Sequence, residues 1–179
     1  SPPASPASRL PRLQENLQAM SDHVTPLLAL YRKFERWPLG QWFFSRAVCF
    51  KAPYFGTISP RFTLLENGRC EATIEDRRRL HNHIGTVHAI ALCNLAELTA
   101  GVMTDASLPK GMRWIPKGMT VSYLKKAKGR LRGIATPNIP LVASETGYDL
   151  PVNVDVVDAS GERVFNAEIR MWLSPAPKR

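Results

Sequence analysis

One long apolar segment with a single carboxylate constrains the fold of this chain more than any other feature. Almost every residue from Thr86 to Thr104 is apolar, and His88, Asn94 and Glu97 are among the few exceptions. The pattern predicts a helix over residues 86–104 with Thr86 as its N-cap. Because this helix is apolar nearly all round, we expect it to be buried in the domain. A buried carboxylate must be paired or have a perturbed pKa, so Glu97 either pairs with an arginine, points into a gap, or acts as a base or nucleophile.

Strand patterns lie on both sides of this helix. Before it, residues 54–65 and 69–75 read as strands joined by a turn at Glu66-Asn67-Gly68, and an irregular basic loop covers 76–85. After it come segments with alternating apolar residues and one weaker strand, at 119–123, 130–135, 152–156 and 165–173. One apolar helix with one antiparallel sheet predicts an α+β domain.

The N-terminal third of the sequence differs in composition and pattern. Residues 1–9 are rich in proline and serine, and we expect them to be disordered, either as native sequence or as the remnant of a targeting segment. Residues 10–50 contain three predicted helices, the second capped by Thr25 with Pro26 at its first position. The third is expected over 41–50, burying Trp42, Phe43 and Phe50. Residues 51–175 form the main domain.

Composition restricts the environment and the partners. The hydrophobic fraction of 44% in 179 residues is enough for a folded domain, and no stretch is long and apolar enough to span a membrane. Three scattered cysteines without CxxC spacing predict free thiols, a cytoplasmic location and no zinc site. The net charge of +9 favours anionic ligands, but no basic strand interleaved with aromatic residues indicates a nucleic-acid partner.

The start of the predicted helix offers hydrogen-bond donors that a reacting oxyanion could use. Backbone amides in a first turn lack intrahelical partners, and Ala89 carries only a methyl group, so a substrate could approach its N–H closely. Ordinary helix packing explains a small residue there equally well. Ala89 and Glu97 are eight residues apart, roughly 12 Å along a helix, which is too far for one helix to place both on one carbonyl. If both serve one site, two antiparallel copies must share it, which requires a homodimer.

The same residues resemble a known family. The run Asn82-His83-Ile84-Gly85-Thr86-Val87-His88-Ala89, followed by Glu97, resembles the signature of hotdog-fold acyl-CoA thioesterases of the phenylacetyl-CoA type. The segment from Tyr123 to Gly129 resembles a strand end of that family, and Ala52-Pro53-Tyr54 and His88-Ala89-Ile90-Ala91-Leu92 resemble runs of a bacterial hotdog family of unassigned function. The resemblance implies a hotdog fold, in which an antiparallel sheet wraps a long central helix, here with extra N-terminal helices.

The resemblance also implies roles for individual residues. Asn82 would orient the thioester or the attacking water, the Ala89 amide would polarise the carbonyl with His88 positioning that turn, and Glu97 of the partner would activate water or attack directly. Substrate contacts are expected at Gly85 and Thr86 of the signature, at Asn94 through a bond to Glu97, and at Lys125, Lys126 and Lys128 with coenzyme A phosphates. No cofactor is implied beyond the coenzyme A thioester as substrate. Loop-capping by Asn82, a structural His88 and solvated lysines are the alternatives.

Some positions depart from the family pattern, and two other functions stay open. The family's Gly-Gly is Ala89-Ile90 here, and Pro116 stands where some members carry a hydroxyl. A hydroxyacyl-thioester dehydratase or hydratase is the second reading, since the fourteen residues from His83 to Glu97 resemble the His-to-acid spacing of the dehydratase branch of the hotdog fold. A non-catalytic acyl-CoA or fatty-acyl binding protein is the third. The sequence does not determine which acyl group is bound or whether coenzyme A or an acyl-carrier protein carries it. It also does not distinguish a dimer from a tetramer.

Overall fold

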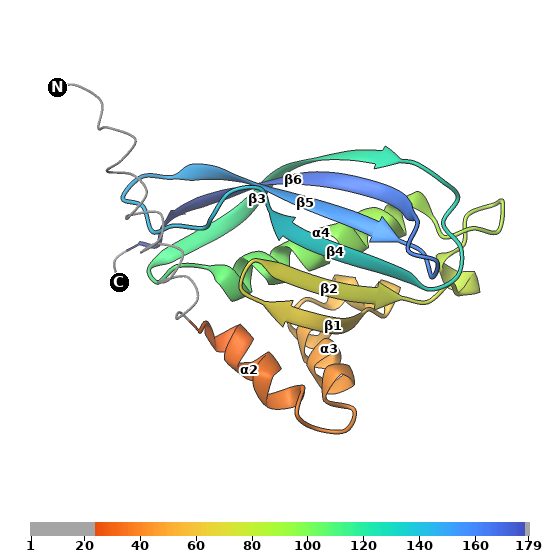
Figure 1. The fold of residues 1–179 in the computed structure, drawn as a ribbon, viewed down its shortest axis with the longest axis horizontal. Coiled ribbons are helices and arrows are strands. Elements are labelled where there is room, and N and C mark those ends of the chain that lie inside the picture. The colour runs from red at the N-terminus through yellow and green to blue at the C-terminus, as the bar shows by residue number, and fades with distance from the viewer. Residues whose placement is uncertain (1–23, 178–179) are drawn as a thin grey trace.

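A computed structural model describes residues 24–177 of the chain as one antiparallel sheet around a central helix (Figure 1). The sheet has the order β1-β2-β4-β5-β6-β3. Its strands are β1 (Arg61–Glu66), β2 (Arg69–Ile74), β3 (Met112–Tyr123), β4 (Leu131–Pro137), β5 (Tyr148–Val157) and β6 (Arg163–Pro175). The predicted strands after the helix are all present, and each is longer than its alternation pattern indicated. The turn at Gly68, which has a φ of 76°, joins β1 to β2 as expected.

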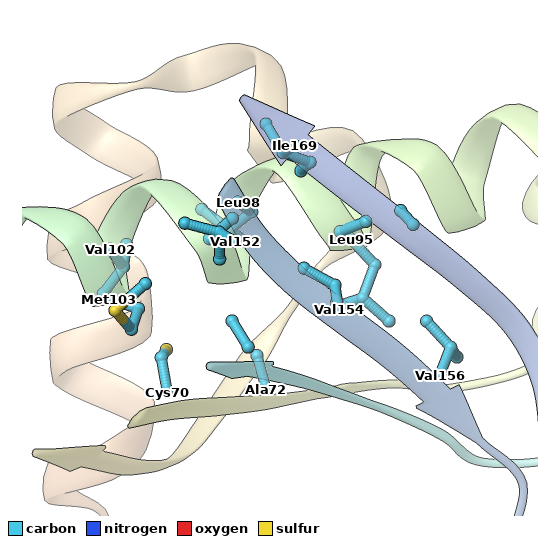
Figure 2. Packing of buried hydrophobic residues seen from close by; sticks show 14 of the residues in the cluster. Cys70, Ala72, Leu95, Leu98, Val102, Met103, Val152, Val154, Val156 and Ile169 are labelled. Atoms are coloured by element: carbon cyan, nitrogen blue, oxygen red, sulfur yellow. The ribbon is translucent and has the colours of Figure 1, made fainter. Parts of the chain in front are cut away.

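The central helix α4 (Ala89–Ser107) supplies much of the core. Leu95 and Leu98 of α4 lie against Val154 and Val152 of β5, and Met103 points toward Cys70 of β2 (Figure 2); all of these side chains are buried. Figure 2 also shows Cys70 and Ala72 of β2 on the same inner surface. The prediction of one apolar helix buried against one sheet is therefore confirmed.

Two further helices lie beyond the β1 edge (Figure 1), α2 (Pro26–Phe34) and α3 (Gly40–Lys51). Thr25 caps α2, as predicted, because its hydroxyl accepts a hydrogen bond from the Leu28 amide. Tyr31 and Phe44 pack edge to face with ring centroids 5.0 Å apart, and both belong to the core that the sheet and α4 form. Burying a side chain of this size contributes about 1.5 to 3 kcal/mol. The predicted helix over residues 10–20 lies outside the described residues.

Three local expectations are wrong. Residues 54–58 do not begin a strand but form a 3-10 helix, η2 (Pro53–Ile58), because Ser59 takes a left-handed conformation with φ 46° and Pro60 cannot donate a strand hydrogen bond. Trp42, Phe43 and Phe50 are exposed rather than buried, with 90% of Phe50 exposed. The buried side chains of this run are Phe44, Ser45 and Cys49, because a helix lying on a surface buries one stripe.

The third correction concerns the start of the central helix, which begins at Ala89 with His88 as its N-cap, and not at Thr86. Thr86 is held in the preceding loop, since its carbonyl accepts a hydrogen bond from the Asn82 amide. Val87 then pairs with His81 in an isolated β-bridge. His88 is therefore the first residue whose side chain can reach a free amide of the helix. None of the described helices is long and apolar enough to cross a membrane.

Candidate active site

A tight loop held by Asn82 leads into α4. The Asn82 side-chain oxygen accepts hydrogen bonds from the amides of Ile84 and Thr86, each at 3.1 Å, and its nitrogen donates to the Thr86 hydroxyl at 2.8 Å. Gly85 completes the turn with a φ of 73°, a conformation that disfavours any residue with a side chain. Asn82 and the buried Thr86 are therefore loop-building residues in this structure, and their side chains are occupied by each other. The tip of the loop, with His83 and Ile84, is exposed.

The first turn of α4 leaves one backbone donor free. His88 is the N-cap, and its Nδ1 accepts a hydrogen bond from the Ile90 amide at 3.1 Å. The next amides, of Ala91 and Leu92, both donate to the His88 carbonyl. The Ala89 N–H has no acceptor among the described residues. A free amide at the positive end of a helix dipole is suited to stabilise a developing oxyanion.

The segment after β3 braces this turn from the other side. The Val87 amide donates to the Ala127 carbonyl at 2.9 Å, and the Gly129 amide donates to the Asp76 carboxylate at 2.9 Å. Asp76 also pairs with the ring of His81. The Gly129 hydrogen bond, and to a smaller extent the contact with His81, lowers the pKa of Asp76. The strand-end motif and the loop before α4 are thus joined in one network around Asp76.

Glu97 lies two turns further along α4 and is exposed in the single chain, contrary to the expectation of a buried carboxylate. It makes no ion pair or hydrogen bond with the part of the chain that the structure describes. Glu97 faces away from the sheet, while its neighbours Ala96 and Leu98 are buried. It lines a cavity of about 560 Å³, together with Trp114 and Pro116 of β3.

Asn94 does not bind Glu97, which corrects the sequence-based expectation. Its nitrogen donates to the Thr57 hydroxyl of η2 at 3.3 Å, because η2 covers this part of α4 while Glu97 points outward. Asn94 is only 7% exposed, and its side-chain oxygen has no hydrogen-bond partner within residues 24–177. With His81, His88 and Tyr54 it lines a second, smaller cavity of about 240 Å³ at the start of α4. The first turn of α4 therefore borders the smaller cavity, and the segment around Glu97 borders the larger one.

Part of the inner sheet face is uncovered in the single chain. Met119 and Tyr123 of β3 pair with core residues of β6, Ile169 and Phe165, so they belong to the inner face. They are nevertheless 39% and 51% exposed. Ile90 of α4 is also exposed, and β3 is the edge strand of the sheet. Exposed apolar side chains next to an open strand edge are typical of an interface.

The three predicted phosphate-binding lysines lie on the exposed segment after β3, with different surroundings. Lys125 pairs with Glu162. Lys128 lies close enough to Asp76 to help lower the pKa of its carboxyl group. Lys126 is exposed and forms no ion pair with the described residues. The consecutive Arg77, Arg78 and Arg79 are also exposed on the segment that begins with Asp76, so two basic runs distant in sequence meet at the start of α4.

Sequence reasoning missed two features of the site. One is Asp76, an acidic residue at the end of β2 that organises the loop. Its only signal was its position beside three arginines. The other is the contribution of α2 and α3, whose residues Leu30 and Val48 line the larger cavity. No local pattern indicates that helices outside the sheet reach the site. Among the described residues no group of three His, Cys, Asp or Glu side chains lies together as a metal site.

Comparisons with known proteins agree with this architecture. A family model described as a domain of unknown function (DUF4442) matches residues 40–173. A structural-genomics protein of known crystal structure shares 44% identity with a TM-score of 0.72, and the match covers 84% of this chain and 99% of that one. Among curated proteins, no sequence matches the chain significantly.

More distant structures share the fold and carry functional descriptions. A Pseudomonas aeruginosa protein described as a probable thioesterase is 23% identical with a TM-score of 0.63, covering 72% of this chain and 91% of its own. A Haemophilus influenzae thioesterase is 13% identical with a TM-score of 0.61, covering 70% and 85%. These likenesses confirm the predicted hotdog fold. The chain belongs to the family of this domain of unknown function, and it has the hotdog fold.

Proposed function

We propose that this protein hydrolyses acyl thioesters, with coenzyme A esters as the substrates, at a site shared by two copies of the chain. The observation that carries the proposal is that one helix holds two groups without hydrogen-bond partners in the described chain, the Ala89 N–H and the Glu97 carboxylate. One group suits a developing oxyanion and the other suits a general base. Together they provide what ester hydrolysis requires.

The two groups can act on one carbonyl only if they come from different copies. Eight residues of α4 separate them by roughly 12 Å. A twofold axis beside β3 would set two α4 helices antiparallel, with Glu97 of one near Ala89 of the other. Such a pairing would also cover Met119, Tyr123 and Ile90, which one chain leaves exposed. The active form is therefore a homodimer with two equivalent sites.

The reaction follows from this arrangement. The Ala89 N–H donates a hydrogen bond to the thioester oxygen, and Glu97 of the other copy removes a proton from water as the water oxygen attacks the carbonyl carbon. The tetrahedral intermediate collapses, the carbon–sulfur bond breaks, and the thiolate takes the proton. His88 holds the first turn in place, and Asn82 holds the loop before it. The products are a carboxylic acid and free coenzyme A.

The basic surface suits the nucleotide end of such a substrate. Lys126 and Lys128 stand at the start of α4, on the segment whose Ala127 carbonyl binds the Val87 amide. Coenzyme A carries a diphosphate and a 3′-phosphate, which lysine side chains can bind. Lys125 is already paired with Glu162 and contributes less. Substrate phosphates would therefore lie beside the amide end of the helix and the acyl group beyond it.

The test is thiol release from acetyl-, butyryl-, lauroyl- and phenylacetyl-coenzyme A by the wild type and by Glu97→Gln. We expect hydrolysis of at least one ester, with kcat at least about 100-fold lower in the variant, because loss of a general base costs about that factor or more. Glu145→Gln, at an exposed position outside both cavities, serves as the matched control and should retain activity. Unchanged rates in Glu97→Gln would contradict the mechanism. Hydration of crotonyl-coenzyme A without thiol release would indicate a hydratase instead.

A further inference from the structure

The larger cavity has the size and lining of a chamber for an apolar chain. Its volume is about 560 Å³, within the range of small-molecule pockets. It lies between α2, α3, α4 and the first half of β3. Most of its lining is apolar, with contributions from Leu27, Leu30, Val48, Phe55, Leu98 and Val102. An apolar hollow of this size in contact with water favours a ligand that buries hydrocarbon.

The polar groups of the cavity give it a direction. Glu97 and Asp105 both line it and are two turns apart on α4. The Asp105 carboxylate accepts a hydrogen bond from the Trp114 indole N–H at 2.5 Å, whereas Glu97 has no partner in the described chain. The Glu97 end therefore has a free carboxylate, whereas the Asp105 carboxylate is already engaged by Trp114. A ligand with one polar end would place that end at Glu97.

The side chains between Glu97 and Asp105 determine how much space the cavity offers to a hydrocarbon chain. Gly101 lies on α4 between Glu97 and Asp105, and a methyl group added there would come within 3.1 Å of the Trp114 ring. Ala47 of α3 is a small residue on the opposite wall. Two small residues thus keep the cavity open at its middle. Larger residues at either position would fill the space that a hydrocarbon chain needs.

We infer that the helices α2 and α3 form the outer wall of an acyl-chain chamber, which makes medium and long aliphatic acyl groups the preferred substrates. The inference rests on the proposed thioester hydrolysis and assigns its substrate class. The thioester lies at Glu97, and the chain runs along α4 past Gly101 toward Trp114. Each methylene buried in the chamber improves binding roughly fourfold. Short acyl groups reach the same reactive groups but leave the chamber empty.

The experiment compares Ala47→Trp with Ala29→Trp. Both alanines are exposed on the N-terminal helices, but only Ala47 lines the cavity, so Ala29→Trp is the matched control. We expect Ala47→Trp to lower kcat/KM for lauroyl-coenzyme A by more than about tenfold and to leave that for butyryl-coenzyme A within about twofold. Gly101→Ala should act in the same direction with a smaller effect. Circular dichroism and thermal unfolding verify that each variant is folded.

Binding of cis-parinaric acid, a fatty acid that fluoresces in apolar sites, separates this inference from the proposed hydrolysis. The wild type and Ala29→Trp should bind it, lauric acid should displace it, and Ala47→Trp should lose it. Chamber binding without any thiol release would overturn the proposed hydrolysis and keep the chamber. If hydrolysis depends on Glu97 but neither on the length of the acyl chain nor on Ala47→Trp, the chamber is contradicted and the proposed hydrolysis stands. A dimer that binds no fatty acid, because the second copy fills the cavity, would also overturn the chamber.

Discussion

The residues that shape the site act mainly on the backbone. Asn82 binds two amides of its own loop, His88 caps α4, and Asp76 fixes the loop through the Gly129 amide. The groups proposed to react, the Ala89 N–H and the Glu97 carboxylate, are unpaired within the described residues. Positioning and chemistry are thus divided between different residues. This division predicts that changes at Asp76 affect stability and its pH dependence more than they affect the chemical step.

The substitution Asp76→Asn tests that role at the residue scale. The folded-state pKa of Asp76 lies below its unfolded value of about 3.9, so its charge stabilises the fold above that pH, and the stabilisation is lost as pH falls through the folded pKa. We expect the variant to be less stable at pH 7 by about 1 to 2 kcal/mol, the contribution of a charge-assisted hydrogen bond. Urea denaturation at neutral and acid pH measures the difference.

The neutral-to-acid comparison needs a control for general charge effects. Asp149→Asn removes a half-exposed carboxylate whose pair with Lys117 spans 3.7 Å, and such surface pairs contribute less than about 1 kcal/mol. It should change stability little at either pH. If Asp76→Asn is equally destabilised at acid and neutral pH, the Asp76 charge does not hold this loop.

At the scale of the elements, one residue, Thr25, both caps helix α2 and anchors it to α4. The Thr25 hydroxyl accepts from the Leu28 amide and donates to the Ala106 carbonyl at 3.2 Å, so it caps α2 and ties this helix to the end of α4. Thr25 is buried, and Leu27 and Leu30 of the same helix line the larger cavity. A change at Thr25 therefore reaches the cavity wall through the position of the whole helix.

Thr25→Ala should lower the free energy of unfolding by about 1 to 2 kcal/mol, because it removes a helix cap and leaves a buried carbonyl without its donor. Thr25→Ser keeps the hydroxyl and should retain most of the stability. Chemical denaturation of both variants gives the comparison. Equal losses in the serine and alanine variants would mean that the methyl group, and not the hydrogen bonds, is what Thr25 contributes.

Elements with a strong pattern were predictable, and those decided by tertiary context were not. The alternation in β5 and β6 and the apolar run of α4 identified the sheet and its central helix, since one buried face repeats in each. The start of α4 shifted from Thr86 to Ala89, because the Asn82 loop competes for Thr86. The exposure of Phe50 and the 3-10 helix at Pro53 depend on which surface faces the core, which a local pattern does not contain.

At the scale of the whole molecule, the single chain leaves apolar side chains uncovered along the β3 edge. The inner face of β3 ends in exposed Met119 and Tyr123, and the Tyr123 hydroxyl lies 3.2 Å from the Cys93 sulfur, a contact that raises the pKa of Tyr123 to about 12. Tyr123 combines an apolar ring with a polar hydroxyl, which suits it to an interface. The spacing of Ala89 and Glu97 predicts a site shared by two copies, and the exposed side chains along β3 are where we predict the second copy to pack.

The measurement that tests the central claim most directly is complementation between two inactive variants. Ala89→Pro removes the proposed oxyanion donor, and proline is well tolerated at the first position of a helix. Glu97→Gln removes the base. Each variant alone should be inactive. After the two are mixed and allowed to exchange subunits, a mixed dimer holds one site with both an intact Ala89 amide and an intact Glu97, so thiol release should return. If both variants are inactive alone, are shown to exchange subunits, and yet recover no activity, the two groups do not come from different chains and the shared site is contradicted.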